Sequence, residues 1–373
     1  MKYFLVVGEK SGDLHAANLM RSLKAEDPQA EFVFWGGNDM EQAGGQLLRH
    51  YKTFSVMGIG EVIKKIPALR KAIKDCAHDI LHYQPDAVIF IDSAAFNLRV
   101  AAKVKPKGIR TFYYISPKIW AWNQKRAYKV KRLIDRMFVI MAFEPEFYQK
   151  YGYEASYVGN PIFDAIQSFT PAPNFLEDYG LVSDKKILAL LPGSREQELR
   201  RILPPMAEAA KRFLQKHSDY QVVVSGVSNL EEFFYKPAAD LGFPVIHNAT
   251  YDLLHRSHLA IVTSGTATLE TALFKVPQVV AYKTSPLTYL IGKMVLKIPY
   301  ISLVNLTAEK LLAEEVLQKA CTGEGLFEAL ERLLPQYGQA KEACDELYEH
   351  VKTEGASLKT AKLMVEDLRG RGL

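Results

Sequence analysis

An aspartate at the end of an apolar run could act as a general base. Asp92 directly follows the run Ala87–Ile91 and is followed by small residues and by Asn97. A carboxylate held at the end of a buried strand can take a proton from a substrate hydroxyl, or it can cap the next helix. Position alone favours the cap, and catalysis stays open as the alternative.

A second candidate loop, residues 8–13 with the sequence GEKSGD, follows the first apolar run. Its glycines permit a tight turn, and Ser11 or Asp13 can cap the helix behind it. The Lys-Ser pair resembles part of a P-loop, but that motif needs glycines where Glu9 and Phe4 stand. The P-loop is therefore excluded, and the loop is either a capped turn or a contact to a ligand.

A turn in the second half of the chain could hold a diphosphate. Gly193, Ser194 and Arg195 follow an apolar run and precede a helical pattern. Free backbone N–H groups, a positive helix end and a guanidinium group would meet there. The alternative is an ordinary turn with a solvated arginine.

Small hydroxyl residues open a further helix, with a glutamate one turn into it. Hydroxyls and helix-end N–H groups can bind phosphate oxygens, and a carboxylate can accept hydrogen bonds from both hydroxyls of a ribose. The alternative is a capped core helix with one exposed glutamate. Because two such turns lie in the same half, we expect a nucleotide there. The residues concerned are Ser264, Gly265, Thr266, Thr268 and Glu270.

Neither a metal nor a cofactor is expected. The sequence has no Asp-x-Asp. The pairs His78/His82 and His255/His258 have helical spacing but no evident third ligand. We therefore expect the histidines to be structural or solvated.

These loops need strands to position them, and short apolar runs alternate with helical patterns along the whole chain. Runs that are apolar on both faces predict parallel sheets covered by helices on both sides. Ligands bind beyond the carboxyl ends of such strands, so the residues after each run are the candidates. The runs are Tyr3–Val7, Phe32–Trp35, Ala87–Ile91, Thr111–Ile115, Met137–Ile140, Ile187–Leu191, Gln221–Ser225, Leu259–Thr263 and Gln278–Tyr282.

The runs fall into two groups. Residues 168–186, rich in Pro, Ser and Asp and without periodicity, separate them. We predict an α/β fold of two Rossmann-like doubly wound domains facing a cleft, residues 1–167 and 187–340, with 168–186 as a linker. Residues 341–373 are expected to be helices, with packing onto the first domain as one option.

The composition is that of an ordinary globular protein. Of 373 residues, 48% are hydrophobic and 24% are charged, and the net charge is +5. That charge is too small for a nucleic-acid binder but suits anionic phosphates or an anionic membrane surface. Three scattered cysteines and no signal-peptide pattern favour a reducing compartment, and we expect the cytoplasm.

Residues 56–74 form a basic amphipathic segment that Pro67 is expected to kink or split. The segment can lie at a membrane interface or can be a surface helix whose apolar stripe belongs to the core, and the pattern alone favours the core. Residues 289–306 are apolar but carry two lysines and Pro299, which predicts a short helix, a break and a strand rather than a spanning helix. The candidate membrane-facing residues are Ile59, Val62, Ile63, Lys64, Lys65, Ile66, Leu69, Arg70 and Lys71.

Together these motifs resemble the lipid-A-disaccharide synthases. The resemblance implies a GT-B fold and a metal-independent, inverting transfer of diacylated glucosamine from UDP to the 6-hydroxyl of diacylglucosamine 1-phosphate. It also implies peripheral binding at the cytoplasmic face of an anionic inner membrane and no nucleic-acid partner, while a homo-oligomer stays open. The matching stretches are GEKSGD (8–13), VMGIGEVIKKIP (56–67), IDSAAFN (91–97), YYISPKIWAWNQKRAYKVKR (113–132), VGNPIFD (158–164), LLPGSR (190–195) and SGTATLE (264–270).

The resemblance also implies roles for single residues. Asp92 matches the base, Arg195 the essential arginine and Glu270 the nucleotide-side glutamate, and Glu9 joins the catalytic candidates. The acceptor-side candidates are Ser11, Gly12, Asp13, Asn97, Ser116 and Trp120. This chain departs from the family pattern at Tyr113, Asn160, Ala95 and the pair Glu309-Lys310.

Two other functions stay open. An isomerase similar to UDP-N-acetylglucosamine 2-epimerase could share the architecture, but it needs no basic amphipathic helix. A non-catalytic sugar-nucleotide sensor at a membrane would leave Asp92 without a role.

Overall fold

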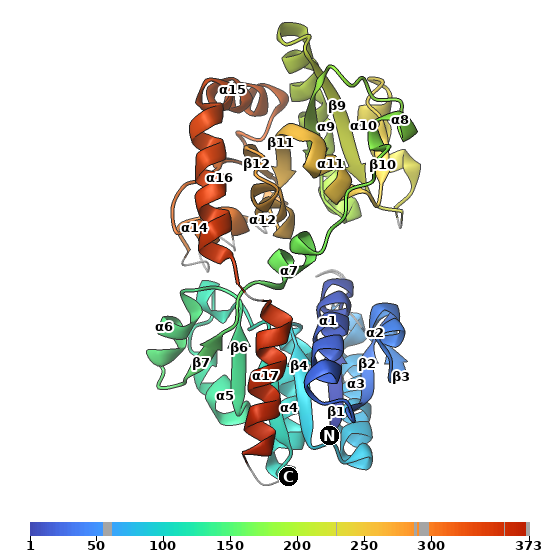
Figure 1. The fold of residues 1–373 in the computed structure, drawn as a ribbon, viewed down its shortest axis with the longest axis vertical. Helices are drawn as coiled ribbons and strands as arrows, with labels where there is room; N and C mark the ends of the chain where they lie inside the picture. Colours follow the sequence, from blue (N-terminus) through green and yellow to red (C-terminus); the bar gives the residue numbers. More distant parts are fainter. Residues whose placement is uncertain (55–61, 229, 287–288, 291–297, 354, 371–373) are drawn as a thin grey trace. The chain divides into compact units, whose positions relative to one another are not determined.

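The computed structural model describes residues 1–54, 62–228, 230–286, 289–290, 298–353 and 355–370, with residues 62–66 described by their backbone alone. The chain divides into two compact units (Figure 1). The first unit contains residues 1–164 and 353–373, and the second contains residues 165–352. Each unit is built around its own parallel sheet.

The sheet of the first unit has the strand order β3-β2-β1-β4-β5-β6-β7, and every pair of neighbours is parallel. The central strands are buried along almost their whole length, which is why their sequences are continuous apolar runs. The strands are Lys2–Val7 (β1), Glu31–Gly36 (β2), Gln46–His50 (β3), Ala87–Ile91 (β4), Arg110–Tyr114 (β5), Arg136–Val139 (β6) and Ala155–Tyr157 (β7).

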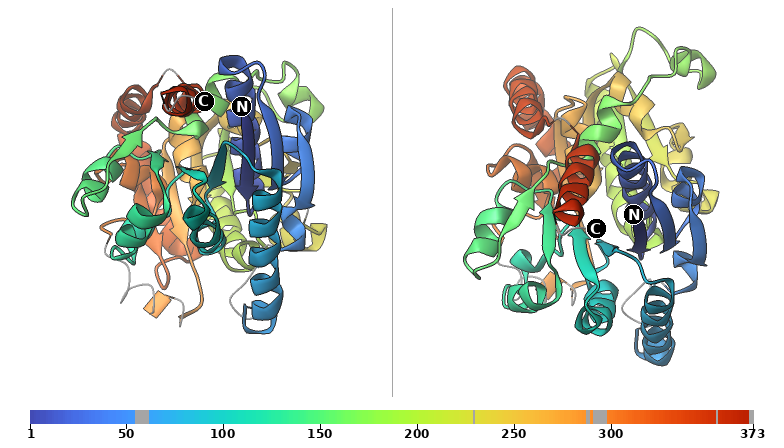
Figure 2. Two further views of the ribbon diagram at one scale, coloured as in Figure 1. Left: turned by 90° about the horizontal axis from the view of Figure 1, so that it is seen from below. Right: turned by 60° about the horizontal axis from the view of Figure 1, so that its bottom comes forward.

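Helices cover both faces of this sheet. Lys10–Glu26 (α1) and Ala356–Arg369 (α17) lie side by side on one face, and Val62–Tyr83 (α3), Ala94–Val104 (α4) and Arg126–Leu133 (α5) cover the other (Figure 2). Side chains of α1 and α17 pack together with β1 in one hydrophobic core. The shorter helices are Asn38–Ala43 (α2), Glu144–Gln149 (α6) and Pro161–Gln167 (α7).

The second unit has the same plan, with the strand order β10-β9-β8-β11-β12-β13. Glu196–Lys216 (α9) and Gly323–Leu333 (α15) pack on one face, and Thr250–Arg256 (α11) and Thr266–Leu273 (α12) lie on the other. The strands are Lys186–Leu191 (β8), Tyr220–Gly226 (β9), Val245–His247 (β10), Ser257–Thr263 (β11), Gln278–Tyr282 (β12) and Glu314–Leu317 (β13). The remaining helices are Phe175–Asp178 (α8), Lys236–Ala239 (α10), Leu303–Ala308 (α14) and Tyr337–Val351 (α16).

Two expected segments are arranged differently from the prediction. Residues 168–186, expected as a linker, belong to the second unit, because Phe175 of α8 is buried in that unit's core. Of the expected C-terminal helices, α16 lies in the second unit and only α17 packs on the first. The start of α17 is fixed by Asp164, whose carboxylate accepts hydrogen bonds from the N–H groups of Ala356 (3.0 Å) and Ser357 (3.1 Å).

The basic amphipathic segment is partly described. Helix α3 continues through Pro67 instead of splitting there. Its C-terminal half packs on the sheet through Ile73, Cys76 and Ile80, while Arg70 and Lys71 are exposed and Leu69 is half-buried. Ile59 and the side chains of Val62, Ile63, Lys64, Lys65 and Ile66 lie outside the described residues.

Residues 303–308 form α14, where a strand was expected after Pro299. The side chain of buried Asn305 bonds the backbone of Leu312 and Ala313 and so fixes the segment that follows this helix. Among the described residues, no helix is long and apolar enough to cross a bilayer.

Candidate active site

The candidate base lies where the strand order of the first sheet reverses. Strands β1 and β4 are parallel neighbours with Val7 opposite Ile91, so Glu9 and Asp92 leave the sheet at the same edge. The chain proceeds from β1 to one side and from β4 to the other, which makes this edge the switch point where such sheets bind ligands. Gly8 allows the close approach, because a Cβ there would come within 2.2 Å of the Ser93 hydroxyl oxygen.

The carboxyl group of Glu9 lies close enough to that of Asp92 to act on its pKa. Burial, and after it the neighbouring carboxyl group of Glu9, raise the pKa of Asp92 to about 7, against the opposing effect of the positive charge of Lys118. A carboxyl with a pKa near neutrality can exchange a proton at working pH, as a general base must. The structure therefore brings together two of the predicted catalytic residues, Glu9 and Asp92.

The backbone at Asp92 is held in a conformation that few residues adopt. Asp92 and Ser93 have φ values of 47° and 38°, in the left-handed region. Buried Asn97 fixes this turn by donating from Nδ2 to the carbonyl groups of Ile91 (3.0 Å) and Asp92 (2.9 Å), and the Tyr113 hydroxyl donates to the Asp92 carbonyl as well.

These contacts change two expectations. The side chain of Asp92 does not cap helix α4, whose N-cap is Ser93, so the capping role favoured by position alone is wrong. Asn97, expected on the acceptor side, is fully buried and supports the backbone of the candidate base.

Asp13 points into the protein instead of toward an acceptor. Its buried carboxylate accepts hydrogen bonds from the N–H groups of Gly37 (2.8 Å), Asp39 (3.0 Å) and Met40 (3.4 Å), and so it caps α2 rather than α1. Ser11 is exposed in the first turn of α1, and Gly12 is buried against β1.

Ser116 and Trp120 meet at a residue that the sequence did not single out. Both side chains donate to Oε1 of Glu144, with a distance of 3.1 Å from the Trp120 indole nitrogen. Oε2 of Glu144 accepts from the N–H groups of Ile140 (3.2 Å) and Met141 (3.0 Å). Ser116 and Trp120 are buried, and their polar atoms already have Glu144 as a partner. Their side chains therefore hold the loop together.

In the second unit, Arg195 lies at the start of α9 with 76% of its side chain exposed. Glu198, one turn into the helix, accepts hydrogen bonds from the N–H groups of Ser194 (3.1 Å) and Arg195 (3.2 Å), and its other oxygen lies 3.3 Å from the Arg195 guanidinium group. Gly193 has φ +107°, and a Cβ there would lie 2.3 Å from Glu198 Oε2. The two N–H groups expected to hold phosphate are thus already bound to a carboxylate of the same turn.

The second predicted phosphate-binding turn lies directly before α12, and two of its hydroxyl groups donate to backbone carbonyl groups. Ser264 donates to the carbonyl of Ile301 (3.0 Å), and Thr268 donates to the carbonyl of Gly265 (2.8 Å). Gly265 and Thr266 are exposed at the start of α12. Gly265 and Thr266 therefore remain open to a ligand, whereas Ser264 and Thr268 shape the turn.

Glu270 follows one turn into α12 and has an aromatic partner that the sequence did not indicate. The Tyr251 hydroxyl donates to its carboxylate at 3.2 Å. Burial raises the pKa of Glu270. Tyr251 sits in an aromatic cluster with Phe169 and Phe274, which fixes its ring.

The histidine pairs do not form metal sites in the described part of the chain, where no group of three or more ligating residues occurs. His258 stacks on Tyr337 and hydrogen-bonds the Tyr220 hydroxyl (2.7 Å), and burial lowers its pKa to about 4. Its role in the structure is packing.

The sequence as a whole matches one family. The model described as lipid-A-disaccharide synthetase matches residues 3–365. A lipid-A-disaccharide synthase from Myxococcus xanthus is 40% identical over 335 residues, 89% of this chain and 88% of that one. A second, from Syntrophus aciditrophicus, is 37% identical over 347 residues, 92% and 91% of the two chains. The chain belongs to this family.

The chain is therefore a glycosyltransferase that acts in the synthesis of the lipid A disaccharide. Its two parallel-sheet domains are of the GT-B type. A UDP-GlcNAc 2-epimerase from Neisseria meningitidis, solved with UDP-GlcNAc, has a TM-score of 0.66 over 99% of this chain and 100% of that one, at 14% identity. Likeness at that identity shows the fold alone, so the isomerase alternative gains no support from it.

Proposed function

We propose that the chain condenses UDP-2,3-diacylglucosamine with 2,3-diacylglucosamine 1-phosphate, giving the β-1,6-linked disaccharide 1-phosphate and UDP. The observation that carries this proposal is the Glu9–Asp92 acid pair at the switch point of the first sheet. A group that accepts a proton near neutral pH suits the activation of a sugar hydroxyl.

The proposed step is a single displacement. The carboxylate of Asp92 takes the proton of the acceptor 6-hydroxyl, whose oxygen forms a bond to the anomeric carbon. The bond from that carbon to the β-phosphate oxygen breaks, and UDP leaves with the electron pair. Inversion follows because the attack and the departure occur on opposite sides of the carbon.

The second unit supplies the nucleotide side of the proposal. The exposed guanidinium group of Arg195 and the open start of α12 at Gly265 and Thr266 suit a diphosphate. Glu270, positioned by Tyr251, suits the ribose hydroxyls. Gly193, Ser194, Ser264 and Thr268 are proposed to shape the two turns that present these groups, and neither a metal nor a cofactor takes part.

An anionic membrane is the proposed partner of the face formed by α3, α4 and α5. Arg99, Arg126, Lys129 and Arg132 form a basic cluster there, and none of the four has an ion-pair partner among the described residues. Partial burial and the three arginines lower the pKa of Lys129. A cluster of cations that repel one another is stabilised by an anionic surface.

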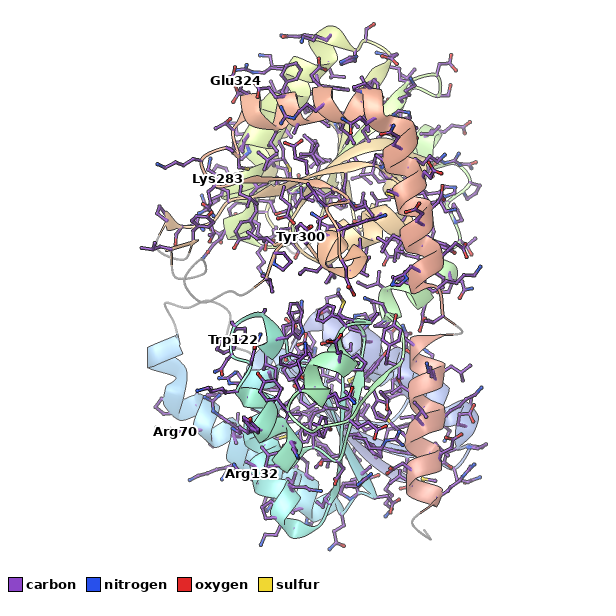
Figure 3. The ribbon with its side chains drawn as sticks, turned by 90° about the vertical axis from the view of Figure 1, so that its left-hand side faces the viewer. Arg70, Trp122, Arg132, Lys283, Tyr300 and Glu324 are labelled. Atoms are coloured by element: carbon purple, nitrogen blue, oxygen red, sulfur yellow. The ribbon has the colours of Figure 1, made fainter. Side chains whose placement is uncertain are left out.

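An aromatic side chain accompanies the basic cluster. Trp122 is 44% exposed, and the Arg126 guanidinium group lies 4.5 Å from its ring centre. Tryptophan is typical of the membrane interface. Arg70, Trp122 and Arg132 lie on the same side of the first unit (Figure 3). These features support peripheral binding at the cytoplasmic face of the inner membrane, where acylated substrates are held.

The test is incubation of the purified chain with UDP-2,3-diacylglucosamine and the acceptor in detergent. We expect UDP and a disaccharide with a β anomeric coupling in the NMR spectrum, and no product with Asp92→Asn. Conversion of UDP-N-acetylglucosamine to its 2-epimer without disaccharide would contradict the proposal.

A further inference from the structure

We propose that Glu144 is a positioning residue that holds the turn 116–120 and thereby keeps the ammonium group of Lys118 beside the Glu9–Asp92 pair. This inference rests on the proposed function, because it assigns Lys118 and Glu144 to the acid-base machinery of that reaction. Neither residue was among the sequence-based candidates.

Glu144 lies in an unusual environment for a carboxyl group. Its side chain is almost completely buried, at 2% exposure, and burial raises its pKa. Four donors face its two oxygens: the Ser116 hydroxyl, the Trp120 indole N–H and the N–H groups of Ile140 and Met141. A buried carboxylate is costly unless it is fully hydrogen-bonded, so this set of donors explains how the group is tolerated.

The four donors to Glu144 belong to two different loops. Ser116 and Trp120 belong to the segment after β5, while Ile140 and Met141 follow β6. One carboxylate therefore joins two neighbouring strand-end loops at the carboxyl edge of the sheet. A neutral glutamine has a single acceptor oxygen, and its NH₂ group would face one pair of donors, so it could not hold both loops.

Lys118 lies in the turn that Glu144 holds. It lies between the two residues that Glu144 binds, and it is exposed while Ser116 and Trp120 are buried. Strand β5 pairs with β4, and the Asp92 N–H donates to the Tyr114 carbonyl at 3.3 Å, so this turn leaves the sheet next to Asp92. The positive charge of Lys118 lowers the pKa of Asp92 against the effect of burial and of Glu9.

Among the described residues, few charged or titratable groups act on the acid pair. Glu9 approaches from the loop before α1, Lys118 from the turn after β5 and the Tyr113 hydroxyl from β5 itself. His15 on α1 faces Glu9, and burial lowers its pKa to about 4, so it is neutral at working pH. Within the part of the chain that the structure describes, Lys118 is therefore the cation that favours the ionised form of Asp92 near neutral pH.

The test is the pH profile of kcat with substrates dispersed in detergent. Lys118→Met should move the acid limb upward by roughly half a unit or more, the effect of removing one nearby charge. Glu144→Gln should move it in the same direction, and the double variant should move it no further, because both act through one charge. Lys107→Met, at the opposite end of β5, is the matched control and should leave the limb in place.

Two further measurements keep the inference testable. If Glu144→Gln fails to fold, Ser116→Ala and Trp120→Phe each remove one donor and should each shift the limb by a smaller amount. A carbon-13 NMR titration of the Asp92 carboxyl should show the same upward shift in Lys118→Met without any substrate.

A merely structural Glu144 predicts a lower melting temperature and a lower kcat at every pH, with no shift of the limb. That result, or an unchanged limb in Lys118→Met, overturns the inference while disaccharide formation still supports the proposed function. Absence of disaccharide from the unaltered chain overturns the proposed function instead, and the NMR titration then decides the inference by itself.

Discussion

Glu9 and Asp92 follow two adjacent parallel strands, and the carboxyl group of Glu9 raises the pKa of Asp92. Two carboxylates that meet in this way cannot both ionise easily, so the pair holds one proton until the pH approaches 7. The register of β1 against β4 is what creates the pair, because it puts Val7 opposite Ile91, so that the residues that follow both strands meet at the same edge of the sheet.

Glu9→Gln should shift the pH profile of the enzyme. Because the hydrogen bond and charge of Glu9 raise the pKa of Asp92, their loss lowers that pKa, and the acid limb of kcat moves to lower pH. Initial rates between pH 5 and 9 measure the shift. An upward shift would mean that Glu9 does not repel the ionised base.

Asp92→Asn should abolish turnover and stabilise the fold at alkaline pH. We expect a loss of at least about 100-fold in kcat with UDP affinity unchanged, as for the removal of a general base. The raised pKa of Asp92 means that its contribution to stability is present below the unfolded pKa and is lost as the pH rises through about 7.

The asparagine variant should therefore melt at a higher temperature than the unaltered chain at pH 8, and at the same temperature below pH 4. Asparagine also tolerates the left-handed backbone at this position. A folded variant with near-normal turnover would remove Asp92 from the mechanism.

Arg195→Ala and Glu270→Gln should each weaken UDP binding. Loss of the guanidinium group removes a charge-assisted contact to the diphosphate, for which we expect a Kd raised about 10-fold or more, and kcat should fall too. Glu270→Gln should affect mainly the ribose and hence the Kd. Calorimetry with UDP measures both, and Arg200→Ala, one turn further along α9, is the control. If Arg195→Ala and Glu270→Gln bound UDP as tightly as the unaltered chain and the Arg200→Ala control, the proposed nucleotide site would be excluded.

EDTA should leave activity unchanged. We expect the leaving diphosphate to be stabilised by Arg195 and by helix-end N–H groups rather than by a cation. Activity that disappears with EDTA and returns with magnesium would show that this reasoning is wrong.

Removal of basic residues from α3 and α5 should weaken binding to anionic vesicles. Each such residue contributes at most about 1 kcal/mol, so changing Lys64, Lys65, Arg70 and Lys71 to glutamine could alter partitioning by orders of magnitude. The triple change of Arg126, Lys129 and Arg132 to glutamine should act in the same direction. Vesicle flotation at several salt concentrations measures the effect, with detergent activity largely retained.

The control for the vesicle experiment is Lys359→Gln with Lys362→Gln on α17, which covers the other face of the sheet. A melting curve of Ile63→Ser tests whether the apolar stripe of α3 belongs to the core. Unchanged flotation together with a collapsed melting temperature would assign that stripe to the core and exclude this membrane surface.

The central strands of both sheets could be predicted from the sequence, whereas the edge strands could not. Runs such as Ala87–Ile91 are apolar on both faces because helices cover both faces. The strands without a predicted run, β3, β7, β10 and β13, all lie at the edges of the sheets and are short and partly exposed. Their sequences therefore lack a continuous apolar signal.

The positions of candidate residues at strand ends could be predicted from the sequence, whereas the directions of their side chains could not. Asp92 and Arg195 follow from the rule that ligands bind at the carboxyl ends of strands. Asp13, Ser116 and Trp120 occupy similar positions, but they bind loop backbone or Glu144, and a sequence does not show which way a polar side chain points. Glu144 was missed because the two side chains that bind it, those of Trp120 and Ser116, lie 24 and 28 residues away in the sequence.

Helix α17 has a consequence for synthesis on the ribosome. Residues 165–352 form one uninterrupted unit, which can fold as soon as it has emerged. The first unit must wait, because Ala361, Met364, Val365 and Leu368 of α17 complete its core beside β1 and α1. The part of the chain that is translated first is therefore finished last, and until then the nascent polypeptide exposes the apolar surface that α17 will cover.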